Sequence, residues 1–295
     1  MINKKIFAFL VCAFFLAGAV IVNALALKDS EPVSVGELQV WPILDANVTM
    51  ESSLLPGLKD FPQYEGVFAN GPAPAVDQTF LVPINDRLVL IDTGWGKGGP
   101  KDGRTLDILS ENNIKPENIG DILLTHMDID HIGGLLDGDK ATFPNATLWI
   151  SKPEYEAWIN GNLDKRPEVA KAKAKKVAEL YKDRIKLFEY GDEIMPGITA
   201  IEASGHTPGH TAFDITNGGQ KLTVAGDIIH IWPVQLPLPQ LSTTYDIDME
   251  KAAKTRERLL DRAAAERSLF AGMHFPMISP VIKRADGGFN MREPR

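Results

Sequence analysis

Cysteine is almost absent from this sequence, which has one, Cys12, among 295 residues. A framework of intrachain disulfides is therefore excluded, and the fold depends on a hydrophobic core large enough to be stable alone. Basic residues are also outnumbered by acidic ones, since the sequence has 31 Lys and Arg against 39 Asp and Glu, for a net charge of −8. This balance argues against a nucleic-acid partner, whose phosphates are bound mainly by Lys and Arg. One basic stretch, residues 165–186, has lysines at helical spacing, and we interpret it as a solvated helix face.

The N-terminal segment has the layout of a secretory signal. Lys4 and Lys5 are followed by an apolar run over residues 6–22 and by the small residues of Ala24-Leu25-Ala26. This order predicts a signal peptide at 1–26, a single domain at 27–295 and a periplasmic or secreted location. No stable membrane contact is expected after cleavage. The alternative is an uncleaved anchor, although the run is short for a spanning helix.

The rest of the sequence alternates strand-like runs with single helical segments. Proline, glycine and asparagine with isolated apolar residues predict an irregular excursion at 47–77, which could act as a flap over a site. Alternating strands and helices predict an α/β architecture of sheets covered by helices. Expected strands lie at 37–44, 78–83, 87–91, 122–124, 147–150, 185–189, 198–202, 212–215, 222–225 and 268–271, and expected helices at 104–112, 168–183, 249–267 and from Pro153 onward.

Histidine is scarce as well, with six residues, yet five of them fall into three short clusters. The clusters are Thr125-His126-Met127-Asp128-Ile129-Asp130-His131, Gly205-His206-Thr207-Pro208-Gly209-His210 and Gly272-Met273-His274. The sixth, His230, follows Asp227 by three residues at the end of an apolar run. Imidazole and carboxylate groups are the side chains that hold zinc, iron or manganese at neutral pH. The clusters therefore predict a metal centre.

Each candidate ligand follows an apolar strand-like run, a position from which a sheet can present side chains to one cleft. His126 and Asp128 alternate along the chain and can face one ion. Asp130 and His131 follow and can face a second ion. Asp227 has two carboxylate oxygens and can bridge both ions. Two ions about 3.5–4 Å apart can share a hydroxide and clamp the oxygens of an ester. The predicted ligands are His126, Asp128, Asp130, His131, His206, Asp227 and His274.

The order of these motifs resembles the five motifs of the metallo-β-lactamase superfamily, over nearly all of the chain after the signal. The motifs are Asp92-Thr93-Gly94, His126-x-Asp128-x-Asp130-His131, His206, Asp227 and His274. Residues 225–230, 246–261 and 273–276 more narrowly resemble the branch of methyl parathion hydrolase, which is related to the acyl-homoserine-lactone lactonases. The resemblance implies a four-layer αββα sandwich with two divalent ions, zinc first, at one edge of the sheets.

One position departs from the superfamily pattern, which normally reads His-x-His-x-Asp-His where this chain has Asp128. A carboxylate is a harder ligand than imidazole, so iron or manganese becomes more competitive with zinc. The change could also weaken the first site until only one ion binds strongly. Alternatively, Asp128 accepts a hydrogen bond from a histidine and binds no metal. We expect such an accepting role for Asp92, toward loop backbone or a ligating imidazole.

Other residues have two open interpretations each. In the related lactonases a tyrosine that contacts the substrate oxygen stands at the spacing of His230, which could donate a proton or polarise a carbonyl. The alternative is a packed histidine, and His210 fits that structural role better than a direct one. Phe61, Phe68 and Trp232 could form the wall of a substrate pocket, or could be ordinary core aromatics.

The resemblance implies an exported metal-dependent hydrolase for a small-molecule substrate. We expect a hydroxide bridging the ions to attack a carbonyl carbon or phosphorus, with Asp130 accepting the released proton. Lactones, aryl esters and phosphotriesters are the expected substrates. A β-lactamase is one alternative, and a non-catalytic metal-binding or sensing protein with a degraded first site is another. The sequence leaves a homodimer open.

Overall fold

The computed structural model describes residues 25–28, 30–98, 101–161 and 163–292. The predicted signal peptide therefore lies almost wholly outside the described residues. Within those ranges, no helix combines the length and the apolar character needed to cross a bilayer.

The first of two large sheets has the strand order β1-β2-β3-β4-β5-β8-β9. Its first four strands pair antiparallel, and β4, β5, β8 and β9 pair parallel. The strands are β1 (Val33–Val35), β2 (Leu38–Met50), β3 (Ala73–Ile84), β4 (Arg87–Ile91), β5 (Ile119–Leu123), β8 (Thr147–Ser151) and β9 (Ile185–Phe188). A separate small hairpin joins β6 (Leu136–Asp137) to β7 (Lys140–Ala141).

The second sheet follows chain order from β10 to β16, and all of its pairs are antiparallel except β13 with β14. Its strands are β10 (Glu193–Met195), β11 (Ile198–Glu202), β12 (Thr211–Asn217), β13 (Gln220–Val224), β14 (Leu269–Ala271), β15 (Ser279–Lys283) and β16 (Phe289–Met291).

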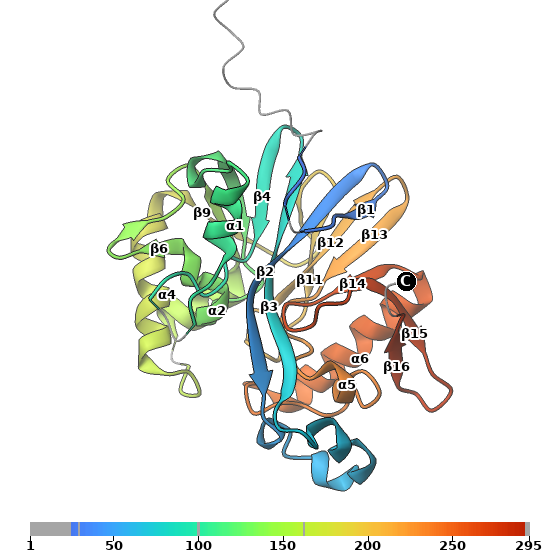
Figure 1. Cartoon of the computed structure of the whole chain (residues 1–295). Helices are drawn as coiled ribbons and strands as arrows, with labels where there is room; N and C mark the ends of the chain where they lie inside the picture. The colour runs from blue at the N-terminus through green and yellow to red at the C-terminus, as the bar shows by residue number, and fades with distance from the viewer. Residues whose placement is uncertain (1–24, 29, 99–100, 162, 293–295) are drawn as a thin grey trace, which may run out of the picture.

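The longer helices cover the outer faces of these sheets (Figure 1). The α-helices are α1 (Thr105–Glu111), α2 (Ile129–Ile132), α3 (Lys152–Tyr155), α4 (Glu168–Tyr181), α5 (Trp232–Gln235) and α6 (Met249–Glu266). The described residues also form short segments of 3-10 helix, or of π-helix in η7: η2 (Ser52–Leu54), η3 (Leu58–Asp60), η4 (Pro62–Phe68), η5 (Pro116–Asn118), η6 (Gly133–Leu135), η7 (Glu156–Asn160) and η8 (Lys182–Arg184).

Three buried apolar clusters define four layers. In one cluster, Leu109 of α1 and Val177 of α4 join the outer face of the first sheet. A second cluster lies between the sheets and includes Val82 and Phe213. A third joins the second sheet to Leu259 of α6. Helices, sheet, sheet and helix therefore stack as an αββα sandwich, which confirms the predicted fold class.

The excursion after the first long strand is shorter and more regular than predicted. Strand β2 continues to Met50 and β3 begins at Ala73, so residues 47–50 and 73–77 are paired strand. The prediction of irregular chain is wrong there, because pairing between two long strands outweighs weak local propensity. Between them, η2, η3 and η4 pack against Ile231 and Val234. Figure 1 shows these turns at the far end of the β2–β3 ribbon.

Candidate metal centre

All seven predicted ligands gather where strands of both sheets end. The first cluster follows β5 and runs into α2, His206 follows β11, Asp227 follows β13, and His274 follows β14. A sharp turn at Gly226, with φ of +58°, allows the chain to reach Asp227, and a Cβ at this glycine would collide with the His210 ring. The sheets thus position side chains that are distant in sequence.

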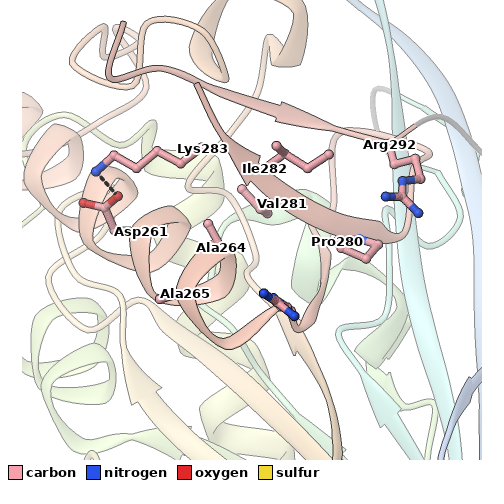
Figure 2. A pocket seen from close by; sticks show the side chains of 9 residues that line it. Asp261, Ala264, Ala265, Pro280, Val281, Ile282, Lys283 and Arg292 are labelled. Atoms are coloured by element: carbon pink, nitrogen blue, oxygen red, sulfur yellow. Dashed lines mark hydrogen bonds and ion pairs between the residues drawn. The ribbon is translucent and has the colours of Figure 1, made fainter. Parts of the chain in front are cut away.

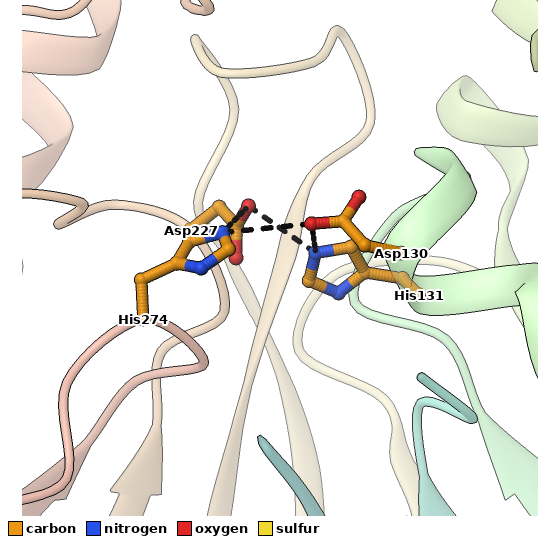
Figure 3. A group of neighbouring side chains, drawn as sticks. All are labelled: Asp130, His131, Asp227 and His274. Carbon is orange, nitrogen blue, oxygen red and sulfur yellow. Dashed lines mark hydrogen bonds and ion pairs between the residues drawn. The ribbon is translucent and has the colours of Figure 1, made fainter. Parts of the chain in front are cut away.

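Four of these side chains form one compact group, with Asp130 and His131 facing Asp227 and His274 (Figure 3). The Oδ2 atom of Asp227 lies 2.7 Å from His274 Nε2 and 3.2 Å from His131 Nε2. All four ligand atoms lie within 4.8 Å of one another. His131 Nε2 and Asp227 Oδ1 are buried and have no hydrogen-bond partner. Two imidazoles and two carboxylates with such unpaired atoms fit a divalent ion such as zinc.

The Nδ1 atoms of both imidazoles in this group face carboxylates outside the group. His131 Nδ1 lies 2.7 Å from Asp92 Oδ2, and Asp92 also accepts hydrogen bonds from the Thr125 backbone and hydroxyl at 2.8 and 2.6 Å. His274 Nδ1 lies 2.8 Å from Asp77 Oδ1. Such partners favour the proton on Nδ1 and leave Nε2 free to bind an ion. Asp92 was predicted in this accepting role, whereas the sequence analysis missed Asp77.

The remaining ligand candidates form a second group on the other side of Asp227. The ligand atoms of His126, His206 and Asp227 lie within 4.8 Å of one another. His206 Nδ1 lies 3.0 Å from Asp246 Oδ1. The carboxylate of Asp128 approaches the same space, with Oδ2 at 3.1 Å from His206 Nε2 and 3.4 Å from His126 Nε2.

Asp128 is already engaged by a guanidinium that the sequence analysis missed. Arg166 Nε lies 2.5 Å from Asp128 Oδ1, and Nη2 lies 2.6 Å from Oδ2, in a two-pronged ion pair. Burial opposes ionisation of this carboxyl, but hydrogen bonds from His126 and His206 and the charge of Arg166 hold its pKa well below the usual range. Arg166 is buried at the start of the basic stretch, so its interpretation as part of a solvated face is wrong.

Comparisons with known proteins agree with this geometry. The profile of the metallo-beta-lactamase superfamily matches residues 73–274, more than half of the chain and the span of all predicted ligands. The chain belongs to this superfamily. Among curated relatives, a probable metallo-hydrolase of Mycobacterium tuberculosis is 25% identical over 184 residues, covering 51% of this chain and 56% of the relative. An N-acyl homoserine lactonase of Bacillus cereus is 28% identical over 151 residues, covering 44% and 54%.

The chain thus spans about half the length of these curated relatives. Solved structures of the superfamily match more fully. The hydrolase AbOPH is 28% identical with a TM-score of 0.77, covering 90% of this chain and 97% of that one. The dizinc quorum-quenching lactonase AidC, in complex with a product, N-hexanoyl-L-homoserine, is 25% identical with a TM-score of 0.81, covering 91% and 98%. The resemblance to the lactonases is therefore confirmed.

Glu154 joins two ligand-bearing loops of this superfamily member. Its Oε1 accepts a hydrogen bond from the Met127 backbone at 2.9 Å. Its Oε2 accepts from the Thr207 hydroxyl at 2.7 Å and the Gly209 backbone at 2.9 Å. The spacing Ser151-x-x-Glu154 has the form of a helix capping box, which explains why its role was missed. The carboxylate points to the loops instead of capping its own helix.

His210 holds the backbone of the shared aspartate. Its Nδ1 lies 2.9 Å from the Ala203 carbonyl, and its Nε2 accepts a hydrogen bond from the Asp227 backbone N–H at 3.0 Å. Burial, with the charge of His206, lowers the pKa of His210 to about 3. The ring is therefore neutral at physiological pH, in the structural position that the sequence analysis favoured.

His230 lies beside the compact group. Its ring stacks on His274 with centroids 4.8 Å apart, and its Nε2 lies 3.5 Å from Asp227 Oδ2. Burial lowers the pKa of His230 to about 4, and its Nδ1 is buried without a hydrogen-bond partner. Tyr245, which the sequence analysis missed, lies with its ring centroid 5.5 Å from that of His230 and is 43% exposed.

The predicted pocket aromatics lie near this edge but in apolar clusters. Phe61 and Phe68 are partly buried and pack in the cluster of Ile231, next to His230 in sequence. Trp232 packs instead in the cluster beneath α6. Elsewhere, a hollow of 790 Å³ between α6 and β15 is lined by residues that include Asp261, and none is a predicted ligand (Figure 2).

Proposed function

We propose that this protein is a metal-dependent hydrolase that opens the ring of a lactone, with N-acyl homoserine lactones as the substrates to test first. The observation that carries the proposal is the group of Asp130, His131, Asp227 and His274, in which all but Asp130 are buried and each imidazole has a carboxylate behind it. The likeness to AidC and to the Bacillus lactonases supports the substrate class.

A divalent ion bound by these residues would supply a water of lowered pKa and an electrophile for the carbonyl oxygen. Residues of the chain would then transfer the proton and hold the substrate. The side chain of Asp130 is 16% exposed, against 3–4% for the other three members, so its carboxylate is the most open acceptor for the proton released on attack. The same group can return that proton to the leaving alkoxide.

His230 is suited to hold the substrate oxygen. Its low pKa keeps the imidazole neutral at physiological pH, so one ring nitrogen carries a proton and can donate a hydrogen bond without a net charge. Tyr245, partly exposed beside it, offers an apolar ring face to a bound substrate. A net charge of −8 on the chain disfavours highly anionic substrates, which is consistent with a neutral lactone.

The test is a substrate panel with protein loaded in turn with zinc, manganese and iron. N-acyl homoserine lactones of short and long acyl chain are compared with aryl esters, phosphotriesters and nitrocefin. We expect lactone hydrolysis that is lost in Asp227→Asn and kept in the matched surface control Asp261→Asn. Preference for nitrocefin would indicate a β-lactamase. Bound metal with no hydrolysis of any class would favour a sensing role and refute the proposal.

We also propose that the protein is exported, on the support of the charged, apolar and small-residue order over residues 1–26. Expression in a Gram-negative host with fractionation and mass measurement tests this. We expect periplasmic protein that begins at residue 27. Full-length protein in the cytoplasm would contradict it.

A further inference from the structure

We propose that the guanidinium of Arg166 replaces one of the two metal ions, so that this chain holds a single divalent ion at Asp130, His131, Asp227 and His274. The inference deepens the proposed function and rests on its metal-dependent site. It concerns the number of ions and the charge of the site, which can be measured without any substrate.

The first step is where the guanidinium lies. Arg166 Nη2 is 2.6 Å from Asp128 Oδ2 and 3.4 Å from Nε2 of His206, a member of the second group. The same Asp128 oxygen lies 3.4 Å from His126 Nε2. A cation of the protein therefore already lies against the space between these imidazoles, and like charges at such distances repel.

The second step is the chemistry of the side chain at position 128. The group that approaches His126 and His206 there is the carboxylate of Asp128 and not a neutral imidazole. The Asp128 side chain is only 15% exposed, so a positive partner stabilises its charge, and the planar fork of arginine matches its two oxygens. The pair Asp128–Arg166 is neutral by itself, so no ion is needed to balance it.

The third step is that, among the described residues, no lysine or arginine balances the carboxylates of the compact group on the other side of the site. In the part of the chain that the structure describes, neither Asp130 nor Asp227 forms an ion pair with a lysine or arginine. Their two negative charges lie close together in a buried site, where burial without a cation is costly. A divalent ion would offset both, which places the retained ion on this side.

The fourth step is that Arg166 is fixed by the fold. Its Nη1 donates a hydrogen bond to the Tyr245 carbonyl at 2.8 Å, and its backbone N–H donates to the Leu163 carbonyl at 2.9 Å. The Pro167 that follows is the N-cap of α4. The side chain is therefore held in place by its neighbours and is not a mobile surface group.

The experiment counts ions in the wild-type chain and in four variants. Metal-free protein is titrated with Mn²⁺, and bound ions are counted by mass spectrometry and by electron paramagnetic resonance. Two Mn²⁺ ions about 4 Å apart are spin-coupled, whereas one ion is not. We expect one uncoupled ion in the wild type and in Arg166→Lys, which keeps the charge. Arg166→Met, and Arg166→Met with Asp128→His, should bind a second, coupled ion with affinity about 10–100-fold above that of the wild type. Arg87→Met, at an exposed arginine, is the matched control and should bind one ion.

Two tight, coupled ions in the wild type would overturn the inference and leave the hydrolase proposal standing. A single ion in the folded double variant would also overturn it, because Arg166 would then not be the group that excludes the second ion. One ion in a wild type that hydrolyses no substrate would support the inference and refute the proposed function. If Arg166→Met alone fails to fold by circular dichroism, the wild type and the double variant still decide.

Discussion

The two sides of the metal centre share Asp227 and the same edge of the sandwich, but they balance their negative charge differently. On the α2 side (Asp130, His131 and His274), no lysine or arginine pairs with the carboxylate in the part of the chain that is described. On the Arg166 side (His126, Asp128 and His206), a guanidinium holds the carboxylate. Both sides have the residue types of a ligand set. Under the proposal made above, the number of ligand residues therefore does not give the number of ions, because a cation of the protein balances the carboxylate on one side.

The most severe test of this comparison removes one imidazole from each side. We expect His274→Ala to weaken binding of the tight ion by more than about 100-fold, because it loses a direct ligand and not merely an outer partner. His126→Ala should leave the affinity of that ion within a few-fold of the wild type. Competition with a fluorescent zinc chelator measures both values. Equal losses in the two variants would contradict the asymmetry.

The next test removes the carboxylate behind an imidazole on each side. Asp92 faces His131, and Asp246 faces His206. We expect Asp92→Asn to lower the affinity for the ion by about 10–100-fold, because the imidazole loses its anionic partner and its fixed orientation. Asp246→Asn should lower it less than tenfold. The chelator assay again gives the answer, and a larger loss in Asp246→Asn would place the tight ion on the Arg166 side.

Much of the fold was predictable because the sheet pattern is local. Strand β11 agrees with the predicted range 198–202, and α6 with 249–267 to within one residue. The far ends of β2 and β3 were not predicted, because their strand form comes from pairing with each other, as in Asn47 with Val76. Short β10, β15 and β16 were also missed, since three to five residues have too little periodicity to detect.

In the site too, residues marked by a local sequence pattern could be predicted, and residues defined by contacts with distant parts of the chain could not. The gathering of the candidate ligands was predictable because each directly follows an apolar run or belongs to a dense local cluster. Arg166 and Asp77 were not, because their partners lie 38 residues or more away and nothing nearby distinguishes them. An arginine at the start of a lysine-rich helix has the pattern of a surface residue. An aspartate among histidines at position 128 was the one sign in the sequence that a positive partner could come from elsewhere in the chain.

A third test concerns the scaffold that is common to both sides. We expect Glu154→Gln to lower the free energy of unfolding by about 1–3 kcal/mol, because the amide nitrogen would face hydrogen-bond donors where a carboxylate oxygen now accepts. Urea denaturation measures the change, with the exposed Glu156→Gln as the matched control. An unchanged midpoint in Glu154→Gln would show that the loops of Met127 and Gly209 are held by other contacts.

The smallest expected effect comes from the start of α6, next to the Arg166 side. The Asp248 side chain accepts a hydrogen bond from the Lys251 backbone at 2.9 Å, and the Asp248 backbone donates one to Gly205, the neighbour of His206. Replacing this N-cap, Asp248→Ala, should lower the free energy of unfolding by about 0.5–2 kcal/mol. Because the change loosens only the Arg166 side, the affinity for the tight ion should remain within a few-fold of the wild type. The matched control is Glu250→Ala in the same first turn. If chelator competition showed a tenfold loss in Asp248→Ala, small movements of His206 would control the ion, and the two sides would have to act as one binuclear site.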